Sequence, residues 1–206
     1  MTAPTTLRPA TESATGRRWR VVDLVVASVL AVACGALFVA WNVAAVGPIQ
    51  LLTPVLPGLQ GLLNGPWLLA GPLAGLIVRK PGAAVYAELV AAALELLILP
   101  TYGPIVLLSG LVQGLGAEIV FALLRYRRFG VLAGLLAGAG AGLAESVVDL
   151  LLWFPGAKPA FVVGYTVSTI VSGAIIGVVA WVLMRALAAT GALDRFAAGR
   201  SARRLV

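Results

Sequence analysis

The sequence predicts an all-α integral membrane protein, a six-transmembrane-helix bundle with both termini in the cytoplasm. Of its 206 residues, 61% are hydrophobic and 11% are charged, and the mean hydropathy is +1.03. These values lie far outside the range of soluble globular chains. Apolar runs of roughly 20 residues, long enough to cross a bilayer, recur along almost the whole sequence. We therefore expect one membrane domain and no separate soluble domain.

Six spans follow one another along the chain. They are expected at residues 20–46, 52–79, 82–99, 104–126, 130–153 and 160–188. The second span begins in "PIQLLTPVLPGLQGLLNGPW" (48–67), whose prolines and glycines predict a broken helix or a loop dipping into the protein before a shorter regular span. Seven segments remain an alternative, although an even number agrees better with two termini on one side.

The two ends of the chain are polar or basic. Residues 1–18 are expected to be a disordered cytoplasmic tail, 19–188 the six-helix membrane domain and 189–206 a basic cytoplasmic tail. The first apolar run contains "AVAC", which could belong to an export signal. That run continues through "GALFVAW" and carries Asp23 just inside its start, so a cleaved signal fits poorly.

Basic residues predict the orientation. Lys158 is the one basic residue expected outside, and the others gather at the termini and at the turns 79–82 and 125–130. They are Arg8, Arg17, Arg18, Arg20, Arg79, Lys80, Arg125, Arg127, Arg128, Arg185, Arg195, Arg200, Arg203 and Arg204. The positive-inside rule places them in the cytoplasm and the loops near 47–56, 100–104 and 154–160 outside. The pI of about 10.5 then reflects topology and does not indicate nucleic-acid binding.

Acidic residues inside the spans fall at two depths. Glu95, Glu145 and Asp149 are expected in the outer layer, and Glu88 and Glu118 lie deeper toward the cytoplasm. No Lys or Arg is expected at mid-membrane depth to neutralise them, so they must face the bundle interior or a pocket, or be protonated. The outer three favour a cationic guest. Protonated packing contacts are an equally good interpretation of Glu88 and Glu118, to which we assign structural roles.

Aromatic and amide side chains share the outer depth of the three carboxylates. Interface belts also use Trp and Tyr, so a single aromatic residue can be an anchor. Together with the acids, however, these groups suit a planar, cationic heterocycle. The candidate substrate-binding residues are Trp41, Asn42, Gln60, Asn64, Trp67, Glu95, Tyr102, Gln113, Glu145, Asp149 and Tyr165, with Trp153 at similar depth.

Small residues form ridges along four of the spans. They are Ala27, Ala31 and Gly35; Gly110 and Gly114; Gly134, Gly138 and Gly142; and Gly173 and Gly177. Such ridges let helix backbones approach closely. Packing within the chain explains most of them, and the ridge on the first span could also receive a partner protein.

Several classes of chemistry are excluded by composition. The chain has one cysteine, Cys34, and no histidine, so intrachain disulfides, imidazole-ligated metals and Cys/His or Ser/His catalysis are ruled out. We expect no cofactor, no metal and no enzymatic activity.

Three stretches resemble a known family. They are "WRVVDLVVASVLAVACGALFVAWN" (19–42), "GPWLLAGPLAGLIVRKPGAAVYAELVAAALELL" (65–97) and "GLVQGLGAEIVFALLRYRRFG" (110–130). They are similar to YkoE-type membrane proteins, the substrate-binding S components of energy-coupling factor (ECF) transporters. The resemblance implies a bacterial cell-membrane protein that captures thiamine or hydroxymethylpyrimidine from outside.

The resemblance also implies partners. In this family a transmembrane T component and two cytoplasmic ATPases drive transport, and an Ala-x-x-x-Ala motif on the first helix serves docking. Ala27 and Ala31 match that motif, and "GPLAGLIVRK" (71–80) lacks the ending of a P-loop, so ATP hydrolysis would belong to the partners. The alternative function is a small cation-coupled secondary transporter, which the lack of visible inverted repeats weakens. An intramembrane enzyme is a more distant rival.

Overall fold

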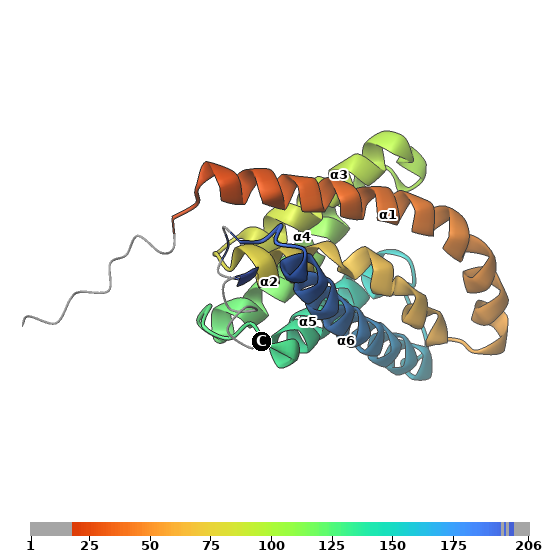
Figure 1. Cartoon of the computed structure of the whole chain (residues 1–206). Helices are drawn as coiled ribbons and strands as arrows, with labels where there is room; N and C mark the ends of the chain where they lie inside the picture. The colour runs from red at the N-terminus through yellow and green to blue at the C-terminus, as the bar shows by residue number, and fades with distance from the viewer. Residues whose placement is uncertain (1–17, 195, 197, 200–206) are drawn as a thin grey trace, which may run out of the picture.

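Six α-helices and two 3₁₀ segments make up residues 18–194, 196, 198 and 199, the part of the chain that this computed structural model describes (Figure 1). The elements are α1 (Val21–Val55), η2 (Leu59–Leu68), α2 (Ala70–Val78), α3 (Ala83–Ile98), η3 (Pro100–Tyr102), α4 (Ile105–Leu123), α5 (Val131–Leu152) and α6 (Pro159–Ala189). The predicted tail 1–18, apart from Arg18, lies outside the described residues, as do Arg195, Arg200, Arg203 and Arg204.

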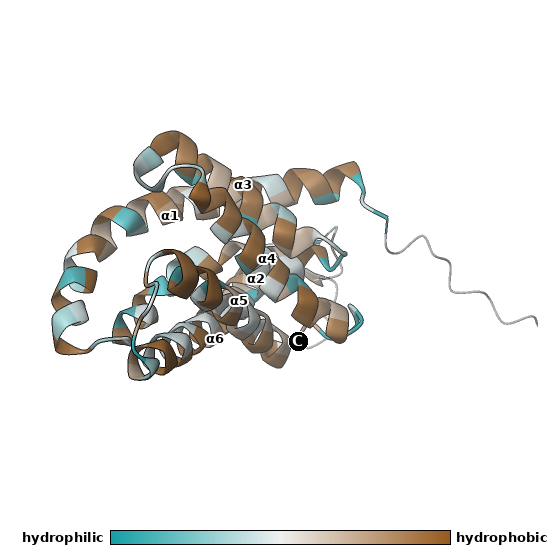
Figure 2. Cartoon of the chain, turned by 180° about the vertical axis from the view of Figure 1, so that it is seen from behind, coloured by the Kyte–Doolittle hydropathy of each residue, from teal (hydrophilic) through white to brown (hydrophobic). Residues whose placement is uncertain are grey.

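The all-α membrane class is confirmed by the helices and their surfaces. Five stretches in the described part of the chain are long and apolar enough to cross a membrane: α1, η2 with α2, α4, α5 and α6. The remaining helix, α3, has 16 residues, or about 24 Å at 1.5 Å per residue. Hydrophobic residues, brown in Figure 2, run along the helices, and many of them are exposed: Leu97 and Leu123 are 81% and 77% exposed. Such exposure is stable when lipid covers it.

The first connection differs from the prediction. We expected a loop near residues 47–56, but α1 continues to Val55 with Pro48 and Pro54 inside it. A proline removes one backbone hydrogen bond and bends a helix without necessarily ending it. Figure 1 shows α1 curving toward η2 over this stretch. The broken second span is confirmed, because a 3₁₀ segment of ten residues precedes the nine-residue α2.

Hydroxyl groups of α6 hold η2 in its irregular form. Ser168 Oγ donates to the carbonyl oxygen of Gly58 at 2.6 Å, and Ser172 Oγ donates to that of Leu62 at 2.7 Å. A Cβ on Gly61 would lie 2.4 Å from the Ser168 hydroxyl, so only glycine permits this approach. These contacts fix the segment that carries Gln60, Asn64 and Trp67.

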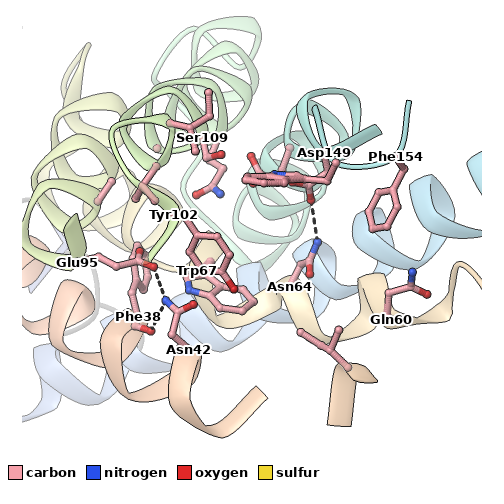
Figure 3. A pocket seen from close by; sticks show the side chains of 18 of the residues that line it. Phe38, Asn42, Gln60, Asn64, Trp67, Glu95, Tyr102, Ser109, Asp149 and Phe154 are labelled. Carbon is pink, nitrogen blue, oxygen red and sulfur yellow. Dashed lines mark hydrogen bonds between the residues drawn. The ribbon is translucent and has the colours of Figure 1, made fainter. Parts of the chain in front are cut away.

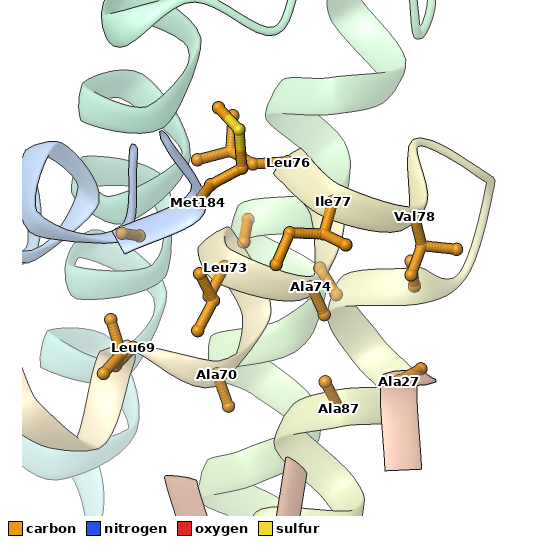
Figure 4. Packing of buried hydrophobic residues seen from close by; sticks show 14 of the residues in the cluster. Ala27, Leu69, Ala70, Leu73, Ala74, Leu76, Ile77, Val78, Ala87 and Met184 are labelled. Atoms are coloured by element: carbon orange, nitrogen blue, oxygen red, sulfur yellow. The ribbon is translucent and has the colours of Figure 1, made fainter. Parts of the chain in front are cut away.

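The core surrounds α2. All nine of its residues are buried, among them Leu73, Leu76 and Ile77, and helices α1, α3, α4, α5 and α6 pack around it (Figure 4). A Cβ on Gly75 would lie 2.2 Å from the ring of Phe121, so α2 and α4 approach closely. The C-terminal segment also joins this core, since Leu193, Phe196 and Ala198 are 1–3% exposed. These described residues of the predicted tail 189–206 therefore pack on the bundle through their apolar side chains.

The glycine ridges bring α5 and α6 together. A Cβ on Gly138 would lie 2.0 Å from the carbonyl oxygen of Gly173, and one on Gly177 would lie 2.0 Å from that of Gly134. The backbones are thus in direct contact, as the ridges predicted.

The ridge on α1 is covered by the chain itself. Ala27 and Ala31 are 0% exposed, and a Cβ on Gly35 would lie 2.8 Å from the carbonyl oxygen of Ala91 in α3. A partner protein cannot contact these residues while α1 occupies this position. The small side chains that would admit a partner helix admit α3 instead, so the prediction of docking at Ala27, Ala31 and Gly35 needs correction.

Candidate ligand-binding site

A cavity of about 220 Å³ opens at the end of the bundle that carries η3 and the α5–α6 connection. The basic turns at Arg79–Lys80 and Arg125–Arg128 lie at the other end of the same helices. The lining residues are Phe38, Asn42, Ile49, Gln60, Asn64, Trp67, Ala92, Glu95, Tyr102, Ile105, Val106, Ser109, Gly110, Gln113, Glu145, Asp149, Trp153, Phe154 and Tyr165. The volume is below the 300 to 1,000 Å³ or so of drug-sized ligand sites, so a small molecule fits.

One polar wall joins α1 to α3. Asn42 Nδ2 donates to Glu95 Oε1 in a short hydrogen bond and also to the carbonyl oxygen of Phe38 at 3.1 Å (Figure 3). Both side chains are buried, at 4% and 5% exposed. Because Asn42 engages one carboxylate oxygen, Glu95 is held in place with its second oxygen left for another partner.

The opposite wall joins η2, α5 and α6. Tyr165 donates its hydroxyl to Asp149 Oδ2 at 2.6 Å. Asn64 Nδ2 donates to the same oxygen at 3.3 Å and to the Tyr165 hydroxyl at 2.8 Å. Figure 3 shows Asn64 and Asp149 separated from Asn42 and Glu95 by Trp67 and Tyr102. The cavity therefore has two acidic walls with aromatic rings between them.

A third carboxyl group lies deeper. Glu145 precedes Asp149 by one turn of α5, and Ser109 and Gln113 of α4 lie against it. Its Oε2 is buried and has no hydrogen-bond partner. No described lining residue is Lys or Arg, and the chain has no histidine. The cavity thus holds three carboxyl groups without a cationic side chain.

Aromatic rings surround the mouth of the cavity. Tyr102 and Trp153 make an edge-to-face contact with ring centroids 5.9 Å apart, and they are 44% and 48% exposed. Phe154 packs on Tyr165 at 5.2 Å. Ring faces and carboxylates together stabilise cations and planar heterocycles.

Ten of the eleven candidate substrate-binding residues line this one cavity. Trp41 does not, because its indole N–H donates to the carbonyl oxygen of Leu63 at 2.8 Å and ties α1 to η2. The sequence-based prediction did not identify the following lining residues as part of a binding site: Phe38, Ile49, Ala92, Ile105, Val106, Ser109, Gly110 and Phe154. Helical spacing could have found some of them, since Phe38 and Ser109 lie four residues before Asn42 and Gln113.

The two deeper acids bond to the chain itself. Glu118 accepts from the backbone N–H groups of Gly82 and Ala84 at 2.8 and 2.9 Å and from the Tyr126 hydroxyl at 2.7 Å, which caps the start of α3. Glu88 is 0% exposed and accepts from the N–H of Gly71 at 2.7 Å. Neither lines the cavity, and their structural role stays a prediction.

A buried ion pair secures the cytoplasm-facing start of α1 in the predicted topology. Asp23 is 0% exposed and bonds to Lys80 Nζ, and Arg20 reaches its other oxygen at 2.9 Å. Trp19 donates its indole N–H to the carbonyl oxygen of Pro81 at 2.9 Å. The start of α1 is therefore fixed to the turn between α2 and α3.

Fold and cavity together define a class: a multi-pass helical membrane protein with an acidic, aromatic-lined cavity within its helices. A family described as the permease component of an ABC-type cobalt transport system matches residues 22–144. The "Putative HMP/thiamine permease protein YkoE" of Bacillus subtilis (strain 168) is 31% identical over 191 residues, covering 89% of this chain and 92% of that protein. A solved structure described as an S component of an ECF transporter superposes with a TM-score of 0.83 at 28% identity, covering 91% of this chain and 94% of the other.

These likenesses extend over most of the chain and confirm the resemblance seen in its motifs. The protein belongs to the YkoE-type S components of ECF transporters. Members of this class are transport components and not enzymes.

Proposed function

We propose that this S component captures thiamine or hydroxymethylpyrimidine in the cavity between η3 and the α5–α6 connection. Glu95, Glu145 and Asp149 supply negative charge, while Trp67, Tyr102 and Trp153 supply ring faces for a planar heterocycle. The name of the Bacillus subtilis relative supports this choice of ligand.

One observation carries the proposal: three carboxyl groups line the cavity and no described lining residue is cationic. Uncompensated carboxylates in a low-dielectric site are unfavourable, and a cationic guest relieves that cost. A thiazolium ring, or a protonated aminopyrimidine, is such a guest.

The proposed topology has six crossings with both termini in the cytoplasm, a membrane domain over 19–188, and tails at 1–18 and 189–206. In this orientation the cavity faces outward and Arg79, Lys80 and the arginines of 125–128 face inward, in agreement with the positive-inside rule. Cysteines can test it in a Cys34→Ala background. Thr101→Cys should react with an impermeant thiol reagent applied from outside and Gly130→Cys should not, and the reverse pattern would overturn the topology.

A T component and two ATPases are the proposed partners. Because Ala27 and Ala31 are covered, the outward face of α1 is the better docking surface, and its exposed Ala36, Ala40 and Ala44 repeat every four residues. Ala40→Trp should leave ligand binding intact and abolish uptake by the full complex. Ala31→Trp should instead destabilise the protein, since its side chain has no room. Uptake unaffected by Ala40→Trp would contradict docking at this face.

Binding itself is tested on the purified protein. Mass spectrometry of the molecule that co-purifies, followed by calorimetric titration with thiamine and hydroxymethylpyrimidine, should identify one or both as ligands. Failure of both to bind would refute the proposed substrate. Uptake without any added T component and ATPases would refute the proposed mode of transport.

A further inference from the structure

Three buried side-chain atoms in the described part of the chain have no hydrogen-bond partner: Nε2 of Gln60, Oε2 of Glu88 and Oε2 of Glu145. Buried polar atoms are almost always paired, because an unpaired one loses its hydrogen bonds to water without gaining any in the protein. Gln60 and Glu145 line the cavity, whereas Glu88 does not. Two of the three unmet hydrogen-bonding groups therefore belong to the wall of one cavity.

The orientation of the Gln60 amide is fixed by η2. Its Oε1 accepts from the backbone N–H of Gly58 at 2.8 Å, and the carbonyl oxygen of Gly58 is held in turn by Ser168. Only the oxygen of an amide can accept, so this bond determines which end of the group remains unused. In Figure 3 the Gln60 nitrogen lies on the side of the amide that faces Phe154. Gln60 is 4% exposed and its Nε2 is buried, so this nitrogen needs an acceptor inside the site.

Glu145 presents the complementary need. The residue is 7% exposed, and Ser109 and Gln113 lie against its carboxyl group while Oε2 stays without a partner. An ionised carboxylate oxygen can only accept a hydrogen bond. A ligand that satisfies both residues must therefore offer an acceptor to Gln60 and a donor to Glu145.

We propose that Gln60 is a specificity-determining residue, whose free amide N–H donates to an acceptor atom of the ligand while Glu145 accepts from an N–H of the same molecule. The inference rests on the proposed function and adds a requirement to it. Positive charge alone does not supply the acceptor for Gln60 or the donor for Glu145. An amino-substituted nitrogen heterocycle carries both groups, with a ring nitrogen or a hydroxyl oxygen as acceptor and its amine as donor. A quaternary ammonium ion carries neither and should bind poorly.

The test is a cycle of variants and ligands, measured by calorimetric titration of the full chain. The ligands are hydroxymethylpyrimidine, an analogue without the hydroxyl oxygen, and an analogue with C–H in place of the ring nitrogens. One analogue lacks the acceptor atom for Gln60, and wild type should bind that analogue about five- to a hundredfold more weakly than hydroxymethylpyrimidine. Gln60→Met should bind hydroxymethylpyrimidine more weakly than wild type does by a similar factor. The same variant should bind that analogue no more weakly than it binds hydroxymethylpyrimidine.

Ser172→Ala is the matched control, because it removes a hydrogen bond that anchors Leu62 of η2 but no atom that lines the cavity or holds Gln60. Any loss it causes should be the same for all three ligands. Gln60→Ala is a second variant in case Gln60→Met does not fold.

Three outcomes would overturn the inference. The first is that the Gln60 variants bind hydroxymethylpyrimidine with wild-type affinity. The second is that the variant and the analogue each reduce affinity and the two reductions multiply. The third is that wild type binds both analogues as tightly as it binds hydroxymethylpyrimidine. If wild type binds neither hydroxymethylpyrimidine nor thiamine, the proposed function fails and the inference fails with it. If wild type binds the ligand and any of the three outcomes is found, only the role of Gln60 is rejected and the proposed function stands.

Discussion

The acidic residues at the two ends of the bundle have the same chemistry but different partners. Toward the basic end, Glu118 bonds to the backbone at the start of α3, Glu88 bonds to Gly71 near the start of α2, and Asp23 bonds to Lys80. Toward the other end, Glu95 and Asp149 bond only to amide and hydroxyl side chains around a cavity.

The difference separates acids that bond to the backbone or to a lysine from acids that line a cavity, and we propose a structural role for the first group and a ligand-binding role for the second. Backbone N–H groups at helix starts, together with Lys80 and Arg20, bond to the carboxylates toward the basic end, and only Oε2 of Glu88 among the described atoms of this group stays without a partner. The carboxylates of the cavity are positioned by amide and hydroxyl groups and have no cationic side chain beside them in the described lining, which is why we propose that they bind a cationic ligand. Substitutions that remove one charge at a time test this division.

The largest expected effect is the loss of the buried ion pair. Asp23→Asn leaves Lys80 buried beside an uncharged group, and breaking such pairs costs about 3 to 5 kcal/mol of stability. Denaturant or thermal unfolding in detergent would measure the loss, and the double variant Asp23→Asn/Lys80→Met should recover part of it. Unchanged stability in the single variant would show that Arg20 and solvent compensate.

Glu95→Gln should affect binding and not stability. The amide keeps an acceptor for Asn42 but removes the charge, so affinity for thiamine or hydroxymethylpyrimidine should fall about ten- to a hundredfold, or roughly 1.5 to 3 kcal/mol. Glu88→Gln is the matched control from the same helix, and it should change the melting temperature more than the affinity. Equal affinity in wild type and Glu95→Gln would remove Glu95 from the site and leave Glu145 and Asp149 as the candidate charges.

Glu118→Gln should lower stability by about 1 to 2 kcal/mol, the range of a helix N-terminal cap. It removes the charge that accepts from Gly82 and Ala84 while leaving the cavity intact. Melting curves without ligand and titrations with it would separate the two properties. If the free energy of binding falls by more than the free energy of unfolding, Glu118 and the cavity are energetically coupled.

The smallest expected effect distinguishes two aromatic residues of the outer layer. Tyr165→Phe removes a hydroxyl that orients Asp149, and affinity should fall only about two- to tenfold because Asn64 still donates to the same carboxylate oxygen. Trp41→Phe removes the bond to Leu63, which lies outside the cavity, and should reduce stability by a similar free energy with affinity unchanged. The opposite pattern would return Trp41 to the binding site and exclude Tyr165.

Composition and apolar runs alone determined the membrane class, and the depth of each acid followed from its distance along a helix. That is why Glu95, Glu145 and Asp149 could be grouped, and Glu88 and Glu118 separated from them, before any contact was known. The prolines and glycines of 48–67 likewise predicted a broken second span, because their backbone restrictions are local.

Only the tertiary structure decided which helix face meets which neighbour. Ala27 and Ala31 have the spacing of a docking ridge, yet α3 covers them, and Trp41 lies one residue from Asn42 but points to Leu63 and not into the cavity. Neighbouring helical residues point about 100° apart, and small side chains pack equally well on a partner or on the chain itself. The sequence records the spacing of such residues, but the relative rotation of the helices is set by packing among all of them at once, which no single stretch of the chain contains.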